Sequence, residues 1–467
     1  MASVADNDGG LNDLLYGLDE LILEKVLAWG RRLYAAILEQ VDGRLKEQRD
    51  RTLSIVHCRE VTIRTRLGPV RVKRRQYQGR DGSYRYLLDE ALGMIRRRHI
   101  TAGVIGKSLS LAVKMPFRQS AAVLEQVGRV ILSHETIRRL VGRVGKAVVS
   151  RMEQEAEAFL ATGALPESQG RAAALLMTEA DGVAVPLQRQ AVRKAEVKLG
   201  IAYEGWRTAG RGRYATINKT IFATTSPGAK YWAGMLLKLH RRYDLGQTGN
   251  VILGGDGAAW VRDGLTFLGG RFQLDRYHLF REMRAAFGAD NESFYALRQC
   301  CEQGRLGEGL AILAKARKRS SDEESADRMV RLGRYLWDNR QGLRDYRLDL
   351  AGMSNPLRRT GAIEGNVDKL LAKRLKRQGM SWSPAGLSWM VAVRILYLEG
   401  QFGSWLKQLA ATTLPQPLLK EEARRTITRT VRKDHGVWLK ACMPVLSGPH
   451  ADRPWVQRLK SLVEAPV

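Results

Sequence analysis

Short apolar runs alternate with turns and helical patterns between residues 173 and 287, and this order constrains the fold more than any other feature of the chain. Three runs separated by short turns predict strands of an antiparallel meander, at residues 173–179, 183–187 and 197–203. Helices and buried strands are then expected to alternate, with a helix at 229–239, strands at 251–253 and 271–274, and a helix at 277–287. Since strands connected through helices pair in parallel, the segment predicts an α/β core in which a meander adjoins parallel strands.

Residues 291–346 interrupt this pattern with helical spacing, many charges and few β-branched side chains. We interpret 288–354 as an all-helical insertion, so that the core occupies 170–287 and resumes at 355–405. Within the resumed core, Ser383 and Pro384 form a strong helix start. The predicted fold class is α+β and multidomain, and the order of elements in its α/β core is typical of ribonuclease-H-like domains.

The amino-terminal part is predicted to be mostly helical. Apolar residues spaced three or four apart from Leu18 to Val41 predict one long amphipathic helix, and we assign 1–50 to it. Its apolar stripe must pack either on its own domain or on a second copy of the chain, which would make it a dimerisation helix. Residues 51–160 predict a basic β-hairpin at Arg59–Tyr77, with its turn at Gly68-Pro69, followed by helices that resemble a helix-turn-helix. Trihelical packing without DNA is an equal alternative for these helices. Residues 406–467 form a further basic region.

The charge of the chain indicates a polyanionic partner. It carries 77 Lys and Arg against 48 Asp and Glu, a formal net charge of +29, and such a surplus favours nucleic acid. Four cysteines without a CxxC pair argue against a disulfide scaffold or a cysteine-built zinc site, and favour a reducing cytoplasm. No apolar run reaches the roughly 18 residues of a membrane-spanning helix, so no membrane is expected.

Clusters of basic residues are the candidates for DNA contacts, although for any one cluster alone a solvated face is the better interpretation. The hairpin contributes Arg71, Lys73, Arg74 and Arg75, and the third predicted helix of the helix-turn-helix contributes Arg138, Arg139 and Arg143. A strongly basic helix after residue 364 contributes Lys369, Lys373, Arg374, Lys376 and Arg377. Together they predict a long surface that follows phosphates of double-stranded DNA.

Three acidic residues, each followed by glycine, are predicted at the ends of core elements: Asp181, Asp256 and Glu364. Strand ends of an open α/β sheet meet at one edge, and Mg²⁺ needs only a few carboxylates because it keeps bound waters. We therefore predict that these three residues hold two Mg²⁺ or Mn²⁺ ions for phosphoryl transfer. For any one acid alone, a turn or a helix cap is the better interpretation. Glu179 and Asp368 share a strand or helix face with members of this set and are alternative ligands.

Asp275 and His278 form a second constellation, spaced three residues apart at the predicted start of a helix. Such a pair can orient a phosphate, donate a proton to a leaving oxygen, or support the strand before it. A capping aspartate with a satisfied histidine on the following helix explains the same pattern equally well.

Five motifs in order make the chain resemble the ISLre-type insertion-sequence transposases: Glu179–Val183, Lys198–Trp206, Gly255–Trp260, Leu274–Phe280, and Ile363–Lys369 continuing to Gly379–Ser383. The resemblance extends to Thr65–Arg75 and Leu87–Gly93. That family is similar to the mutator-type transposases, which have an RNase-H-like domain with a DDE triad and a helical insertion before the glutamate. The resemblance implies a triad of Asp181, Asp256 and Glu364, and it implies that Asp275 and His278 are the family's Asp-x-x-His element.

These features predict a bacterial transposase that cuts element ends and joins the 3′-OH ends to target DNA. The expected partners are terminal inverted repeats, target DNA and at least one further copy of the chain, in the bacterial cytoplasm at the nucleoid. A catalytically inactive DNA-binding protein is the first alternative. A tyrosine recombinase, suggested by His278 and Arg281, is a second, although the strand-end aspartates fit that chemistry poorly.

Overall fold

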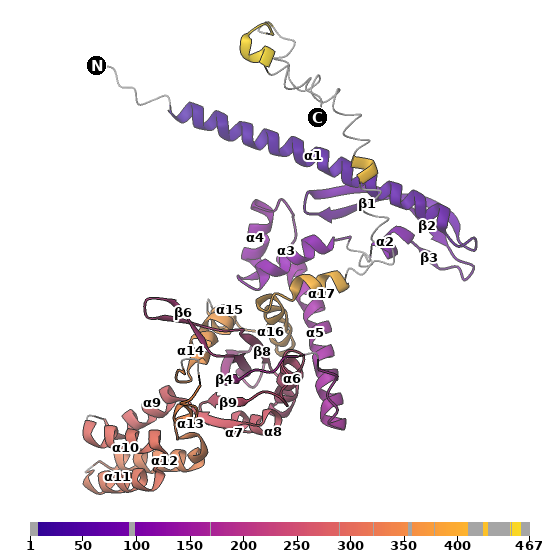
Figure 1. The fold of residues 1–467 in the computed structure, drawn as a ribbon. Helices are drawn as coiled ribbons and strands as arrows, with labels where there is room; N and C mark the ends of the chain where they lie inside the picture. Colours follow the sequence, from indigo (N-terminus) through magenta and orange to yellow (C-terminus); the bar gives the residue numbers. More distant parts are fainter. Residues whose placement is uncertain are drawn as a thin grey trace, which may run out of the picture. The chain divides into compact units, whose positions relative to one another are not determined.

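The structure of the protein is a computed structural model. It describes residues 8–92, 99–168, 170–288, 290–320, 322–353, 357–377, 379–409, 424–427, 449 and 451–458 (Figure 1). The chain divides into two compact units. The first consists of Met1–Ser108, Arg118–His134 and Gly403–Val467, and the second of Leu109–Phe117 and Glu135–Phe402. Most of the basic region predicted at 406–467 lies outside the described residues.

The first unit contains a long helix packed on a twisted hairpin. Helix α1 spans Asp8–Gln48, and the hairpin consists of β1 (Ser54–Thr65) and β2 (Gly68–Gln78), which a short β3 (Tyr84–Arg85) extends. Further helices of this unit are α2 (Leu87–Ala91), most of α3 (Ala102–Ala112), most of α4 (Phe117–Gln126) and most of α17 (Phe402–Leu409). Leu38 and Val41 of α1 share a small core with Ile63, Val70, Val72 and Leu88.

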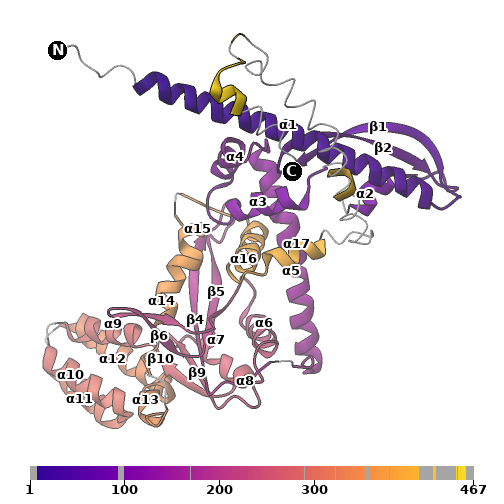
Figure 2. The same ribbon diagram turned by 45° about the horizontal axis from the view of Figure 1, so that its top comes forward.

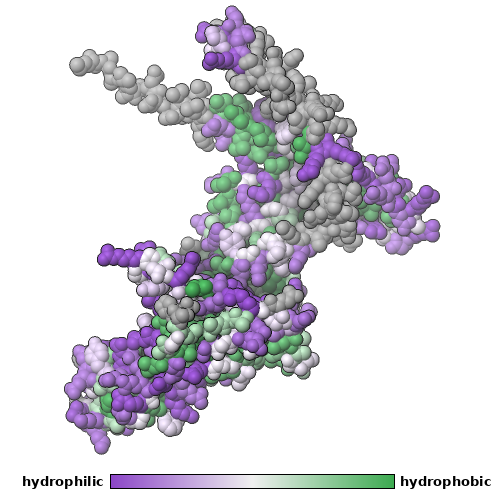
Figure 3. Space-filling model, viewed as in Figure 1, coloured by the Kyte–Doolittle hydropathy of each residue, from purple (hydrophilic) through white to green (hydrophobic). Residues whose placement is uncertain are grey.

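One sequence prediction for this unit needs correction, and one feature of α1 could not be predicted. The hairpin turn lies at Arg66-Leu67 rather than Gly68-Pro69, because the Thr65 hydroxyl accepts from the Leu67 amide and donates to the Gly68 carbonyl oxygen. The apolar stripe of α1 is buried only in its second half. In the first half, Leu18–Val26 holds five large apolar side chains that are at least 42% exposed, visible as a hydrophobic stretch over α1 in Figure 3.

The second unit is built on a five-stranded sheet in the order β10-β9-β4-β5-β8. Its strands are β4 (Leu175–Pro186), β5 (Lys194–Tyr203), β8 (Thr220–Thr224), β9 (Asn250–Gly255) and β10 (Arg271–Leu274). β4, β5 and β8 pair antiparallel, whereas β9 and β10 run parallel to β4. A separate two-stranded hairpin, β6 (Trp206–Gly210) and β7 (Arg213–Thr216), is inserted between β5 and β8. The sequence patterns did not predict that hairpin.

Helices cover both faces of this sheet (Figures 1 and 2). On one face lie α6 (Gly228–His240) and α8 (Gly264–Leu268), whose buried side chains join one large core with Leu176, Ala180 and Leu253. On the opposite side of β4 lie α14 (Ala362–Asn366), the π-helical η2 (Val367–Ala372) and α15 (Lys373–Leu375) (Figure 2). The unit also contains α5 (His134–Thr162), α7 (Ala259–Arg262), α9 (Arg276–Phe287) and α16 (Pro384–Leu398).

The predicted all-helical insertion consists of α10 (Asn291–Gln303), α11 (Leu306–Arg319), α12 (Glu323–Asp338), the 3₁₀ turn η1 (Arg340–Gly342) and α13 (Tyr346–Asp349). Its apolar side chains, among them Leu297 and Leu336, belong to the same core as the sheet. The insertion is therefore part of the second unit and packs against α9. Within the described residues, no helix combines the length and apolarity needed to cross a membrane.

Three local predictions for the second unit differ from the structure. Residues 173–179 and 183–187 were expected to form two strands, but β4 is continuous, because β5 pairs with it through Asp181↔Leu199 and on to Pro186↔Lys194. The segment after Glu364 is π-helical rather than a regular α-helix. Helix α5, which we had placed with the DNA-binding region 51–160, belongs to the second unit from Glu135 onward.

Candidate active site

Three aspartates lie in a row across the parallel strands of the sheet. Ala180 of β4 pairs with Gly255 of β9, and Gly255 pairs with Leu274 of β10. The next residue on each chain segment is Asp181, Asp256 and Asp275, respectively. Neighbouring strands lie roughly 4.8 Å apart, so the register alone brings these three positions together. The parallel pairing ends here although β4 itself continues.

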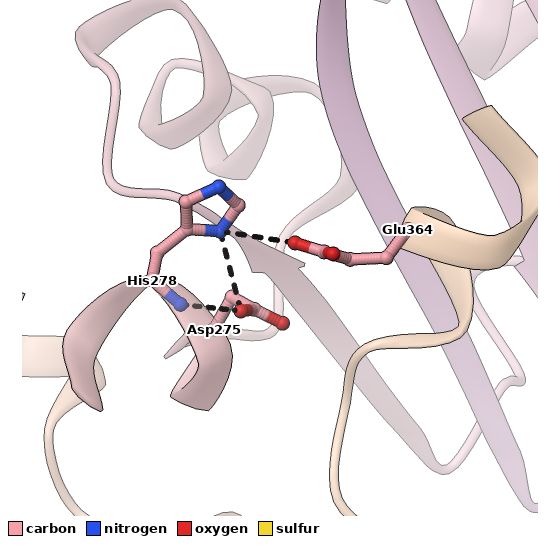
Figure 4. A group of neighbouring side chains, drawn as sticks. All are labelled: Asp275, His278 and Glu364. Carbon is pink, nitrogen blue, oxygen red and sulfur yellow. Dashed lines mark hydrogen bonds and ion pairs between the residues drawn. The ribbon is translucent and has the colours of Figure 1, made fainter. Parts of the chain in front are cut away.

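Glu364 and His278 complete the cluster from two helices (Figure 4). Asp275 caps α9 by accepting from the His278 amide at 3.0 Å, and its Oδ1 also lies 3.3 Å from His278 Nδ1. The same ring nitrogen lies 3.6 Å from Glu364 Oε1, which α14 carries toward the strand ends. Asp275, His278 and Glu364 each offer one ligand atom, and these atoms all lie within 4.8 Å of one another.

The donor atoms of this cluster fit a divalent cation. Asp275 is 2% exposed, and its Oδ2 is buried without a hydrogen-bond partner among the described residues. A buried carboxylate oxygen without a donor is costly unless a cation satisfies it. The set of aspartate, glutamate and imidazole groups suits Mn²⁺, and its carboxylates suit Mg²⁺.

The charges of the other acids act on Asp181. Its Oδ1 accepts from the Gly182 amide at 2.7 Å. Burial raises the pKa of Asp181, and the negative charges of Asp256 and Glu364 raise it further, against the lowering effect of the Gly182 amide and His278. Since these charges act on one another, the four residues share one electrostatic environment. Asp181 and Asp256 are nevertheless not part of the 4.8 Å group formed by the other three.

The remaining pKa shifts reflect the same crowding of acids around one imidazole. Burial raises the pKa of Glu364, with a further increase from Asp275 and an opposing effect of His278. The hydrogen bond with Asp275 raises the pKa of His278, against the desolvation that lowers it. A proton on His278 is therefore favoured while no metal ion is present.

The loop after Asp256 is held by the helical insertion. Asp256 Oδ1 accepts from the Ala258 amide at 2.9 Å, and the Tyr335 hydroxyl of α12 donates to the Asp256 carbonyl oxygen at 2.8 Å. Gly257 has φ +89°, and a Cβ there would come within 2.4 Å of Asn339 Oδ1. The glycine after Asp256 is thus required by backbone conformation and by the close approach of the insertion.

Glu179 has a role that the sequence analysis left open. Its side chain is 1% exposed, and Oε2 accepts from the amides of Gly361 at 3.0 Å and Ile363 at 2.9 Å, while the Tyr203 hydroxyl donates to Oε1. Burial raises its pKa against these donors. Because Ile363 immediately precedes Glu364, Glu179 fixes the start of α14 to β4, two residues before Asp181. The signal available in the sequence was the spacing, because Glu179 lies two residues before Asp181 and therefore shares a strand face with it.

Asp368, the other alternative ligand, is bound elsewhere. Its carboxylate lies 2.7 Å from Arg377 and 3.8 Å from Lys373. It therefore forms ion pairs with the basic segment instead of joining the cluster.

The basic segment after Glu364 does not present all of its cations to solvent. Lys369, Lys373, Lys376 and Arg377 are exposed, but Arg374 is 2% exposed. Its Nε donates to the Ala112 carbonyl oxygen at 2.8 Å, and its guanidinium lies 5.0 Å from the Trp382 ring centroid. The assignment of Arg374 to the DNA-binding row was wrong, because the side chain connects segments of the interior.

The basic clusters of the amino-terminal half are largely neutralised. Arg74 is 7% exposed and pairs with Asp89, so its assignment to a DNA surface was also wrong. Arg75 pairs with Asp42, and Glu135 binds both Arg138 and Arg139. The remaining candidates, Arg71, Lys73 and Arg143, are exposed, with Arg71 at 3.9 Å from Glu60.

Comparison of the sequence with known proteins places the chain in a family. The sequence model of the family described as "Uncharacterised protein family (UPF0236)" matches residues 9–408. A relative from Caldanaerobacter subterraneus subsp. tengcongensis is 26% identical over 424 residues, covering 87% of this chain and 84% of its own, and its name covers eleven loci of one genome. A second relative from the same organism, also 26% identical, covers four loci. A Streptococcus gallolyticus relative, named for the 3′ region of vanSb, is 26% identical over 354 residues, 74% of each chain.

Proposed function

The chain belongs to the uncharacterised protein family UPF0236, and we propose that it is the DNA transposase of a bacterial insertion sequence. In this proposal the second unit is an RNase-H-like catalytic core that cuts the element ends and joins their 3′-OH groups to target DNA. Relatives with many copies in one genome support it, since a mobile element multiplies together with its gene. The net charge of +29 supports a nucleic-acid substrate.

The observation that carries the proposal is the convergence of acids from four separate segments. Asp181, Asp256 and Asp275 follow paired positions of three adjacent parallel strands, and Glu364 reaches the same edge from α14. Acids this close repel one another, so a fold retains them together at a cost in stability. Such retention is typical of a metal-dependent catalytic site.

Asp181, Asp256 and Glu364 would hold two Mg²⁺ or Mn²⁺ ions, which supply an activated water and stabilise the leaving oxygen of the cut strand. His278 Nδ1 lies between Asp275 and Glu364, so a proton on that nitrogen holds Glu364 toward the strand ends. Gly365, which follows Glu364, has no atom of the described residues within 4 Å of where a Cβ would stand and leaves room for a phosphate backbone. In contrast, the space beside Gly182 and Gly257 is filled by Glu196 and Asn339. Pairing two element ends would require at least a dimer.

The test uses the full chain and a labelled DNA fragment that contains an element end with its flank. Asp181→Asn and Asp256→Asn should abolish strand cleavage and strand transfer in Mg²⁺, a loss of at least about a thousandfold, while binding of the same DNA is retained. Asp263→Asn, which alters an exposed aspartate of the same unit, serves as the matched control and should cleave normally.

Full cleavage by either site variant would refute the assignment of these residues. A wild-type chain that binds the DNA tightly but never cuts it would favour the inactive DNA-binding alternative. A covalent protein–DNA adduct that survives denaturation would point instead to a tyrosine recombinase.

A further inference from the structure

The β6–β7 hairpin is a second basic arm, and it lies in the unit that carries the acid cluster. It forms its own two-stranded sheet outside the five-stranded one. It projects from the body of the unit in Figure 1, and hydrophilic side chains gather over its projecting end in Figure 3. Every residue from Arg207 to Tyr214 is exposed.

The charge of this hairpin is not neutralised. Arg207, Arg211 and Arg213 lie on it, and within the part of the chain that the structure describes none of the three guanidinium groups takes part in an ion pair. No acidic residue occurs between Glu204 and Asp244. Glu204, the acid nearest the hairpin in sequence, is already bound to Arg171, Asn218 and Tyr243.

The turn of the hairpin does not pack against other described parts of the protein. Gly210 and Gly212 have φ of +136° and +67°, and a Cβ added at either position would meet no atom within 4 Å. These glycines therefore serve the backbone conformation of a tight turn, which carries Arg211 at its tip. A two-stranded ribbon of this kind is narrow enough to enter a groove of duplex DNA.

The hairpin is joined to the surroundings of the acid cluster by one buried contact and one exposed contact. Trp206 is buried and its ring lies 5.1 Å from that of Tyr203, which donates its hydroxyl proton to Glu179, the carboxylate that holds the start of α14. On the other strand, the Arg358 guanidinium stacks on the Tyr214 ring at 3.6 Å, six residues before Glu364. Whatever the arm binds is thereby held at a fixed position relative to Glu364.

We propose that the β6–β7 hairpin binds duplex DNA next to the cleavage site, with Arg207, Arg211 and Arg213 on backbone phosphates. The identity of the partner rests on the proposed function, whereas the surface itself rests on the unpaired arginines. Phosphates supply the negative charge that the protein does not supply to these side chains. In this proposal the unit that cuts the DNA also binds it.

The experiment compares two triple variants of the full chain, each losing three positive charges. One is Arg207→Gln/Arg211→Gln/Arg213→Gln. The matched control is Arg151→Gln/Arg271→Gln/Arg305→Gln, which removes arginines already paired with Glu155, Asp349 and Glu308. Binding to a fluorescent duplex of about 30 base pairs is measured by anisotropy over a KCl series, in EDTA so that no cleavage occurs.

The hairpin variant should lower the slope of log affinity against log salt by about 2 to 3, because each phosphate contact contributes about 0.9. The control should change the slope by less than about half as much, since its arginines are already neutralised. Both should keep the wild-type thermal midpoint, because only exposed side chains change. Equal slopes for the hairpin variant and the wild type, or equal losses in both variants, would overturn the proposal. The result does not depend on catalysis, so a wild-type chain that fails to cleave would refute the proposed function alone.

Discussion

Two regions of the molecule differ in how many basic partners each acid has. In the first unit each of two acids has its own guanidinium on β2, since Asp42 of α1 pairs with Arg75 and Asp89 of α2 pairs with Arg74. At the strand ends of the second unit, four acids lie near one another, and one histidine is at ion-pair distance from two of them. Within the described residues, His278 is the only basic group at ion-pair distance from any of the four.

The difference separates charge that stabilises a fold from charge that is available to a ligand. Ion pairs in the first region match one acid with one guanidinium, so removing one partner leaves the other without its counter-charge. Acids in the second region repel one another until a cation is added. The same reasoning distinguishes the two basic hairpins, because the arginines of β2 are largely neutralised whereas those of β6–β7 are not.

The largest effect is expected where an ion pair is broken. Arg75→Met leaves the carboxylate of Asp42, which is 1% exposed, without its guanidinium and should destabilise the first unit by about 3 kcal/mol at pH 7. Burial already raises the pKa of Asp42 against the lowering effect of Arg75. In the variant the folded-state pKa rises further above the unfolded value, so stability is lost as the pH rises above about 4.

Urea unfolding of the wild type and the variant at pH 4.5 and pH 7 measures this difference. Arg71→Met, which removes an arginine that is 80% exposed, is the control and should cost less than about 0.5 kcal/mol. A loss in Arg75→Met that is the same at both pH values would contradict the role given to Asp42.

An intermediate effect is expected at Glu179, an acid beside the cluster whose carboxylate already has hydrogen-bond donors. Glu179→Ala leaves the Gly361 and Ile363 amides unpaired, which should cost about 2 kcal/mol and displace Glu364. Glu179→Gln keeps an acceptor for both amides and can present its NH₂ group to the Tyr203 hydroxyl oxygen. It should therefore recover most of the stability and of the Mg²⁺-dependent cleavage.

Cleavage rate at several Mg²⁺ concentrations and thermal unfolding of both variants check this role. Loss of cleavage in Glu179→Gln equal to that in Glu179→Ala, with the thermal midpoint recovered, would show that the charge of Glu179 acts on the reaction directly. The effect of Glu179 on cleavage would then not be explained by the positioning of α14 alone.

The smallest effect, and one of opposite sign, is expected when an acid of the cluster is neutralised. In metal-free buffer Asp256→Asn should stabilise the second unit by roughly 1 kcal/mol, because one source of repulsion is removed. Mn²⁺ at 100 times its dissociation constant should stabilise the wild type by about 2.7 kcal/mol and the variant by much less. Calorimetric unfolding with and without Mn²⁺ measures both. If the variant is less stable than the wild type in metal-free buffer, the acids of the cluster do not repel one another, and the two regions do not differ in this respect.

Several elements could be predicted from the sequence because their signals are local. The strand Arg271–Leu274 and the helix that follows it were predicted within one residue, since Asp275 provides the cap between them. The helix start at Ser383 was also correct, and its hydroxyl accepts from the Gly386 amide. In each case one short segment contains both the apolar pattern and the residue that ends or begins the element.

Other features were decided by partners far away in the sequence. Asp181 was expected to close a strand, yet β4 continues past it because β5 supplies a hydrogen-bonding edge. Arg374 was expected on a solvated row, yet it is buried beside Trp382 and binds a carbonyl oxygen 262 residues earlier. The unpaired state of the arginines on β6–β7 also depends on where every acid of that unit lies.

The sequence by itself determined which residues carry charge, where several strands and helices begin, and that acids stand beside glycines within the core segments. Those properties depend on backbone preferences and on side-chain spacing within a few residues. Only the tertiary structure decided which acids meet, which of them already have a donor, and which basic groups remain without a partner. The physical reason is that a charge is neutralised through space over a few ångströms, whereas its partner along the chain can be hundreds of residues away.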